Sequence, residues 1–286
     1  ELEKAGYDKG MASGAIAASG GLAAIIPPSV FVIIYAVLTD QSAGEMFIAI
    51  LGPGLLTTAL FSLYCVIRCC ITPAMGPKQL HATWKERIHC LPAAIPVMLT
   101  FMIVIGGIYG GLATPTEAAA LGVIGVMLIA LCMGRLTKKL LVPAFKEGAK
   151  MSAAIFFLFI GGWLMARFMV TTGTTRHMVD MFVGFNMSYN TLLFAMFVLF
   201  LILGCILEST SILVLTMPFM FPITQQYGVD PVWFGVFVTM MMVLAGISPP
   251  VGLNVFVVRS VCRHIPIMTI YRGAFPFICM MVIAIL

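Results

Sequence analysis

The 286-residue sequence predicts an all-α integral membrane protein, because of its composition, the length of its apolar runs and the pattern within those runs. Apolar residues make up 61% of the chain and charged residues 9%, which is more apolar side chain than a soluble domain can bury. The runs are continuous and lack the strict alternation of transmembrane strands. Since every backbone polar group needs a partner in hydrocarbon, the runs are expected to be helices.

Four apolar runs are expected to be ordinary membrane-spanning helices. They cover residues 46–70, 91–112, 116–133 and 151–170, and each is close to the roughly 20 residues that a helix needs to cross the hydrocarbon core. The third run follows Thr114-Pro115-Thr116-Glu117, which has the spacing of a capping box with proline at the first helical position.

Three longer segments are expected to be interrupted. The runs 11–38 and 232–258 each contain a Pro-Pro pair, and proline removes a backbone donor and clashes with the preceding turn, so both are predicted to be broken helices. The run 191–222 is too long for one span and has a polar break at its centre. It is therefore predicted to be a re-entrant hairpin.

The two ends of the sequence predict an internal piece of a longer polypeptide. The chain begins at Glu1 with neither an initiator methionine nor a signal segment. It ends at Leu286 in an apolar run that starts near Ala274, so the last helix is expected to be truncated.

The basic residues predict the orientation of the spans. All Lys and Arg residues except Arg167 and Arg176 fall at alternate ends of the runs, and these ends are assigned to the cytoplasm. The basic ends stay on one side of the membrane along the whole chain only if the run 191–222 enters and leaves on the non-cytoplasmic side. The segment from Lys78 to His89 is expected to be a basic amphipathic stretch on the cytoplasmic surface.

An internal repeat is indicated when the two Pro-Pro pairs are aligned. At an offset of 222 residues, seven positions of 6–28 are identical in the second copy: Gly6, Asp8, Leu22, Ala23, Ile25, Pro27 and Pro28. The predicted orientation makes the copies inverted, which is typical of secondary transporters. We therefore divide the chain into 1–90, the second half of a first repeat with its connector, 91–112, a connecting helix, and 113–286, a second repeat.

The breaks have the chemistry of a cation site. Carbonyls that a Pro-Pro pair frees within a bilayer persist only where they line a cavity or bind something, and a dehydrated sodium ion suits carbonyls with hydroxyls beside them. A proline kink without a ligand is the alternative. At the hairpin break, Glu208 would cost about 2.5–3.5 kcal/mol at the bilayer centre, so it is functional, paired or a structural helix cap.

Arg167 is the candidate partner for an anionic substrate, because it is a basic residue inside a span and can pair bidentately with a carboxylate. Snorkelling of its side chain to the interface is the alternative. The stretch 171–175 is either a further interruption or a helix end. Candidate substrate contacts are Arg167, Glu208, Ser29, Asn254 and Thr171.

Other classes of protein find little support. The histidines lack metal-ligand spacing, and the chain has no P-loop, Cys-x-x-Cys or G-x-S-x-G, so an enzyme is not expected. No basic patch with interleaved aromatics indicates nucleic acid. A channel is a rival, since it also uses carbonyls and hydroxyls, but paired broken helices in one chain favour a transporter.

Several motifs in this order resemble the large membrane subunit of tripartite ATP-independent periplasmic (TRAP) transporters. The resemblance covers essentially the whole chain. The motifs are Gly6-Tyr7-Asp8, Ile25-Ile26-Pro27-Pro28-Ser29, Gly107-Ile108-Tyr109-Gly110-Gly111, Thr114-Pro115-Thr116-Glu117-Ala118-Ala119-Ala120, Gly228-Val229-Asp230-Pro231 and Pro249-Pro250-Val251-Gly252-Leu253-Asn254.

The resemblance implies a multi-pass protein of the bacterial inner membrane with an ion-transporter-type fold, two hairpins and a moving, elevator-type transport domain. It also implies sodium-coupled uptake of an organic acid such as sialic acid or a C4-dicarboxylate, delivered by a periplasmic binding protein. A small membrane subunit would be a further partner, beside membrane lipid. A sodium/organic-anion symporter of the same architecture that needs no binding protein is the alternative.

The resemblance further implies sodium sites where a hairpin tip meets a broken helix. One site would use the tip with the second break, namely Ser209, Thr210, Ser211, Gly246, Ser248 and Pro249. The other would use the break at Gly21, Ile25 and Pro27, with a first hairpin that is expected to precede Glu1. The sequence departs from the family pattern at Glu208 and Ser248, where aspartate and threonine are usual.

Overall fold

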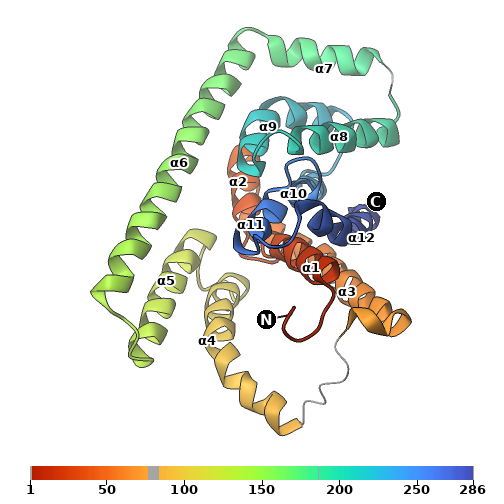
Figure 1. Cartoon of the computed structure of the whole chain (residues 1–286). Coiled ribbons are helices and arrows are strands. Elements are labelled where there is room, and N and C mark those ends of the chain that lie inside the picture. The colour runs from red at the N-terminus through yellow and green to blue at the C-terminus, as the bar shows by residue number, and fades with distance from the viewer. Residues whose placement is uncertain (1, 77–83, 186, 286) are drawn as a thin grey trace. The chain divides into compact units, whose positions relative to one another are not determined.

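The computed structural model describes residues 2–76, 84–185 and 187–285. These residues form twelve α-helices and one short 3-10 helix, with no strand among them, which confirms the all-α prediction (Figure 1). Four of the helices are long and apolar enough to cross a membrane: α3 (Ala43–Ile71), α5 (Pro115–Cys132), α6 (Lys138–Thr171) and α12 (Ile267–Ile285). Two compact units are present, a first unit of Glu1–Lys78 with Phe159–Leu286 and a second unit of Gln79–Leu158.

Both predicted broken helices are found in the first unit. Helices α1 (Lys9–Leu22) and α2 (Val30–Thr39) flank the first Pro-Pro pair, and α10 (Pro231–Ile247) and α11 (Leu253–Val261) flank the second. Both Pro-Pro peptide bonds are cis. The first helix of each pair starts in the same way, because the carboxylates of Asp8 and Asp230 each accept a hydrogen bond of 2.8 Å from the amide three residues on.

The second broken helix lies at the centre of the first unit. Almost all of α10 is buried, and α10 contacts α1, α2, α3, α8, α9 and α12. Tyr35 of α2 is fully buried and donates a hydrogen bond of 2.7 Å from its hydroxyl to the Pro231 carbonyl. A broken helix in this position can present its break to the interior of the protein, as a binding site requires.

Helices α1 and α12 approach closely because glycines meet. A Cβ at Gly14 would overlap the backbone of Gly273, and one at Gly273 would overlap Gly10. This is the small-residue contact by which membrane helices pack without a hydrophobic driving force. The start of α12 was predicted wrongly: the helix begins at Ile267 and not near Ala274, because polar residues in its first turns (Thr269, Tyr271 and Arg272) interrupt the apolar run.

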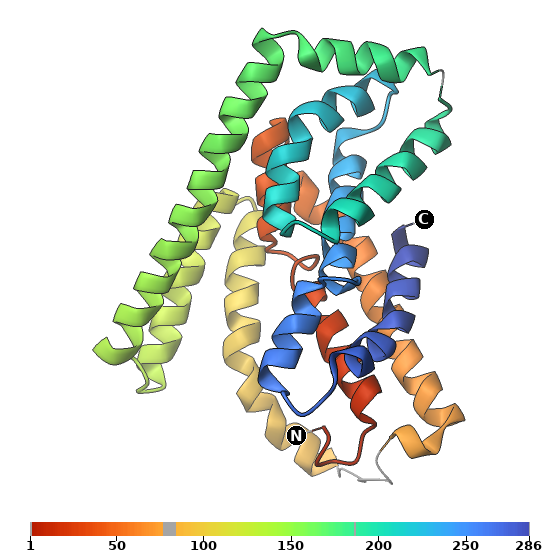
Figure 2. The ribbon, with the colours of Figure 1, turned by 45° about the horizontal axis from the view of Figure 1, so that its top comes forward.

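The predicted break in the run 191–222 is confirmed. Helices α8 (Tyr189–Gly204) and α9 (Ser209–Gln226) are joined by a short turn at 205–208. Helix α8 packs on α10 and α9 on α2, as Figure 2 shows for the teal pair of helices. Gly204 lies so close to Ala245 of α10 that a side chain on it would overlap Ala245. The turn of this pair therefore lies near the end of α10.

The second unit contains α4 (Trp84–Tyr109), α5 and the start of α6. Thr114 and Glu117 form the predicted capping box, with the Thr114 amide donating to Glu117 at 2.8 Å and the Glu117 amide to Thr114 at 3.4 Å. Gly122 of α5 lies against Val104 of α4, which draws these two helices together. The predicted amphipathic segment 78–89 falls partly outside the described residues.

Helix α6 is longer than the predicted span 151–170. It begins at Lys138, because lysine, glutamate and alanine are good helix formers and continue the helix beyond the apolar run. It ends at Thr171, and Gly173, with a φ of 73°, separates it from α7 (Thr174–Gly184). The polar stretch 171–175 is therefore the boundary between two helices.

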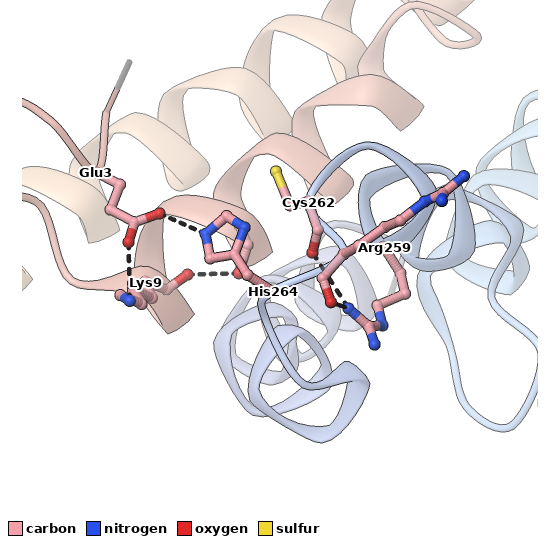
Figure 3. A network of polar contacts seen from close by, with 7 residues as sticks. Glu3, Lys9, Arg259, Cys262 and His264 are labelled. Carbon is pink, nitrogen blue, oxygen red and sulfur yellow. Dashed lines mark hydrogen bonds and ion pairs between the residues drawn. The ribbon is translucent and has the colours of Figure 1, made fainter.

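A small network joins the start of the chain to the loop between α11 and α12. The Glu3 carboxylate lies between Lys9, at 2.8 Å, and His264, at 2.6 Å (Figure 3). The hydrogen bond from Lys9, followed by that from His264, lowers the pKa of Glu3 to about 2. Arg259, in the last turn of α11, donates to the carbonyls of Cys262 and Arg263 in the same loop.

Candidate functional site

The two breaks meet around the side chain of Asn254, in the first turn of α11. A Cβ at Gly20 or Gly21 would lie 4.0 or 3.5 Å from the amide nitrogen of Asn254, and one at Gly246 would lie 3.6 Å from it. The amide therefore lies next to the end of α1 and the end of α10 at once. Of the predicted substrate contacts, Asn254 is the one that the structure places between the two breaks.

Glycine is needed at Gly21 because the two broken helices cross there. A Cβ at this position would lie 2.5 Å from a methyl carbon of Val243. Carbon atoms in real proteins do not approach so closely, and so a larger residue would force α1 and α10 apart. Gly21 thus has a packing role in addition to its predicted place near a cation.

Hydroxyl groups lie at both breaks and are buried. Ser29 caps α2: its oxygen accepts from the Val32 amide at 3.4 Å and its hydroxyl donates to the Ala24 carbonyl. Ser248 donates to the Leu244 carbonyl at 2.7 Å. Each oxygen keeps lone-pair capacity after these bonds, so both can also face a ligand.

The turn between α8 and α9 contacts the second break directly. The buried hydroxyl of Ser209 donates to the Met242 carbonyl at 3.2 Å, and the Cys205 thiol lies 3.1 Å from the Pro249 carbonyl. The turn residue Cys205 therefore lies at the predicted break residue Pro249, whereas the predicted hairpin residue Ser209 contacts α10 at Met242, six residues before Ser248. Thr210 and Ser211 follow Ser209 on α9 and are half-buried.

Glu208 has the geometry of a helix cap. Its carboxylate accepts from the Ser211 amide at 3.1 Å and from the Thr210 hydroxyl at 3.0 Å, and the side chain is exposed. A carboxylate at a helix N-terminus also interacts favourably with the helix dipole. The capping alternative for Glu208 thus has a complete set of hydrogen bonds.

Sequence reasoning missed two residues that hold the second break. Tyr271 of α12 donates to the carbonyls of Pro250, at 2.8 Å, and Val251, at 3.0 Å. Together with Cys205, it hydrogen-bonds three consecutive carbonyls, those of Pro249, Pro250 and Val251, in the non-helical segment between α10 and α11. No local signal marks these residues, because they come from other helices.

Arg167 and Thr171 are not buried with the break residues. Both are exposed on α6, and the Thr171 hydroxyl bonds to the carbonyls of Arg167, at 2.9 Å, and Phe168, at 3.0 Å, in its own helix. The neighbouring Leu164 and Phe168 are exposed as well. This position fits a side chain that reaches from an apolar surface toward the interface.

Comparison with known families gives a match over the whole sequence. A profile described as the DctM component of the tripartite ATP-independent periplasmic transporter matches residues 1–286. The chain belongs to this family. A DctM-family chain is part of a transporter permease and not an enzyme, so the resemblance in the motifs is confirmed.

Known relatives agree with this assignment. The chain is 30% identical over 282 residues to the ectoine TRAP transporter large permease protein TeaC of Halomonas elongata, covering 98% of the chain and 65% of the relative. It is 30% identical over 285 residues to the C4-dicarboxylate permease protein DctM of Pseudomonas aeruginosa, covering 99% and 66%. It is 31% identical over 283 residues to the sialic acid permease protein SiaM of Vibrio cholerae, covering 97% and 64%. The chain thus spans just under two thirds of their length.

Proposed function

We propose that this DctM-family chain is the membrane-embedded part of a sodium-coupled permease that imports an organic acid. A periplasmic binding protein would deliver the acid, and a small membrane subunit would be the third component, in keeping with the tripartite description of the family. One observation carries the proposal. The turn between α8 and α9 contacts the break between α10 and α11, and this break lies beside the break between α1 and α2. Carboxylates such as sialic acid or C4-dicarboxylates are the proposed substrates, since relatives are named for them.

The proposed sodium site lies where the α8–α9 turn meets the second break. Ser209 is 7% and Ser248 is 4% exposed, and hydroxyl oxygens shielded to this degree are effective ligands for a dehydrated cation. The ends of α10 and α8 supply carbonyls beside them, among them those near Gly246. At the first break, Gly21, Ile25 and Pro27 would form a second site together with a hairpin from another part of the full-length transporter.

The substrate site is proposed between the two breaks, beside Asn254 and Ser29. The Asn254 amide would donate to an oxygen of the carboxylate, and the Ser29 hydroxyl would do so by turning from the Ala24 carbonyl to which it now donates. Arg167, Thr171 and Glu208 would contribute only if the full protein covers them, because all three are exposed in this chain.

Helix contacts support an internal two-fold repeat. In the repeat, α1 corresponds to α10, α2 to α11 and α3 to α12. Corresponding helices make corresponding contacts: the contact of α1 with α11 matches that of α10 with α2. Likewise, the contact of α1 with α12 matches that of α10 with α3. Gly21 and Val243, equivalent at the 222-residue offset, lie against each other, as equivalent positions near a two-fold axis do. Together with the alternation of basic residues, this supports the inverted repeat typical of secondary transporters.

Uptake by the full-length transporter in proteoliposomes tests the proposed function. With the small subunit and the binding protein present, an inward sodium gradient should drive accumulation of a labelled organic acid, and collapse of the gradient should abolish it. Accumulation that needs sodium but no binding protein would favour the alternative symporter. Flux without sodium dependence would contradict coupled transport.

A further inference from the structure

A basic cavity of about 750 Å³ lies away from the breaks, between the start of α1, the end of α3 and the start of α12. Three cationic side chains line it, those of Lys9, Arg68 and Arg272, and two tyrosines, Tyr7 and Tyr64, lie beside them. All of these residues belong to the first unit. The cavity therefore combines positive charge with hydroxyl donors.

The positive charge of the cavity is only partly neutralised. Within the described parts of the chain, neither Arg68 nor Arg272 lies within ion-pair distance of a carboxylate, whereas Lys9 pairs with Glu3 at 2.8 Å. Asp8 is the one acidic residue in the cavity lining, and its carboxylate accepts the Met11 amide as the cap of α1. Two guanidinium groups are thus available to an anion.

The position of the cavity indicates a ligand of the membrane surface. Arg68 lies in the last turn of α3 and Arg272 in the second turn of α12, and both helices are long and apolar enough to cross a membrane. Arg272 and Pro276 lie one turn apart on α12, and Pro276 and the buried Met11 continue the cavity wall with apolar surface. A suitable ligand has an anionic head with an apolar body below it.

We propose that this cavity binds the headgroup of an anionic phospholipid. Arginine pairs bidentately with phosphate, tyrosine hydroxyls add donors at the level of the interface, and basic pockets between membrane helices are suited to such headgroups. The bound lipid would bridge α1, the first half of a broken helix, to the spans α3 and α12. A soluble anion would use the cations but gain nothing from the apolar wall.

Native mass spectrometry of the purified full-length transporter tests the proposal. Phosphatidylglycerol and phosphatidylcholine are titrated onto the wild type, the pair Arg68→Gln/Arg272→Gln and the matched pair Arg135→Gln/Arg263→Gln, whose side chains are exposed and lie outside the cavity. A cation that lies beside a bound anionic headgroup strengthens binding about fivefold, so loss of both cavity arginines should weaken phosphatidylglycerol binding about 30-fold. The arginines of the matched pair do not line the cavity and so do not contact the headgroup; their replacement should weaken binding less than about threefold. Phosphatidylcholine binding should not change.

Equal weakening by both pairs, or none by the cavity pair, would overturn the proposal. Arg272→Gln alone keeps the test decisive if the double variant does not fold, because Arg272 is exposed, and it should cost about fivefold. Inorganic phosphate is the soluble control in lipid-free detergent. If millimolar phosphate stabilises the wild type but not the cavity pair, while phosphatidylglycerol shows no preference over phosphatidylcholine, the cavity takes a soluble anion and the lipid assignment is wrong.

Discussion

Ser209 and Ser211 lie on the same turn of α9 but have different surroundings. The Ser209 hydroxyl is buried against the Met242 carbonyl, whereas Ser211 is half-buried and its amide bonds to the Glu208 cap. In the full-length transporter, Ser209→Ala should raise the sodium concentration for half-maximal uptake about fivefold or more, because loss of one buried polar partner costs about 1–3 kcal/mol. Ser211→Ala should raise it less. Unchanged sodium dependence of uptake in both variants would remove this turn from the site.

A conservative substitution of Arg167 distinguishes its two candidate roles, snorkelling to the interface and binding the substrate. Its side chain is exposed beside exposed Leu164 and Phe168, four residues before the end of α6, so we expect it to snorkel. Arg167→Lys should then keep uptake within about twofold, since lysine also reaches the interface. A loss of about tenfold or more, with normal membrane insertion, would instead indicate a bidentate pair with the substrate, which lysine cannot form.

Glu3 makes a pH-dependent contribution to the stability of the fold, and the lowered pKa of its carboxyl fixes the sign of this contribution. Lys9, and then His264, lowers this pKa from 4.5 to about 2. A carboxyl with a lowered pKa in the folded state stabilises the fold above its unfolded pKa, and the contribution is lost as the pH falls toward the folded value. The Tm difference between wild type and Glu3→Gln should therefore be present at about pH 5 and disappear as the pH falls to near 2. The difference is small because the groups are exposed, and one that persists at the lowest pH would contradict the assignment.

At the scale of elements, α1 and α12 depend on glycine for their contact. Gly14→Ala should destabilise the protein by about 1–3 kcal/mol or more, because the new methyl group would overlap the backbone of Gly273. Gly52→Ala on α3 is the matched control: nothing lies within 4 Å of its Cβ position, so the helix propensity of alanine should leave stability equal or higher. Thermal unfolding in the same detergent compares the two. Equal stability of both variants would mean that α1 and α12 are not packed as described.

The starts of α12 and α6 show where a local hydropathy pattern misplaces the boundary of a helix. The apolar run predicted the start of α12 near Ala274, but the helix starts at Ile267, since Ile270 is buried in the core while Arg272 is exposed at the cavity. A hydropathy run averages over both faces of a helix and so discards a turn that is half polar. Helix α6 extends beyond its apolar run for the same reason.

At the scale of the whole molecule, the proposed inverted repeat places Asp8 and Asp230 on opposite sides of the membrane. Both side chains are exposed and both cap a helix, so Asp8→Cys and Asp230→Cys lose the same capping interaction, about 1 kcal/mol each, and serve as matched probes. In a cysteine-free background on intact cells, an impermeant thiol reagent should label position 230 and not position 8. Labelling of both positions from outside would contradict the inverted orientation.

The candidate site was predictable in its parts but not in its assembly. Proline chemistry located both breaks, and the polar sequence at 207–211 located the turn between α8 and α9. The sequence could not show that Asn254 lies beside Gly21 and Gly246, or that Tyr271 occupies the carbonyls of the second break. These contacts join positions that are far apart in the chain, and no local periodicity encodes them.

The sequence by itself determined the all-α membrane class, the breaks, the helix caps and the family, because each of these follows from a short stretch of residues and its backbone chemistry. Only the tertiary structure decided which interruption meets which, that glycines hold α1 against α12, and that cations from three helices gather around one cavity. The physical reason is that such sites consist of side chains whose separation in space depends on packing between helices. A glycine or an arginine looks the same in the sequence whether or not another helix lies against it.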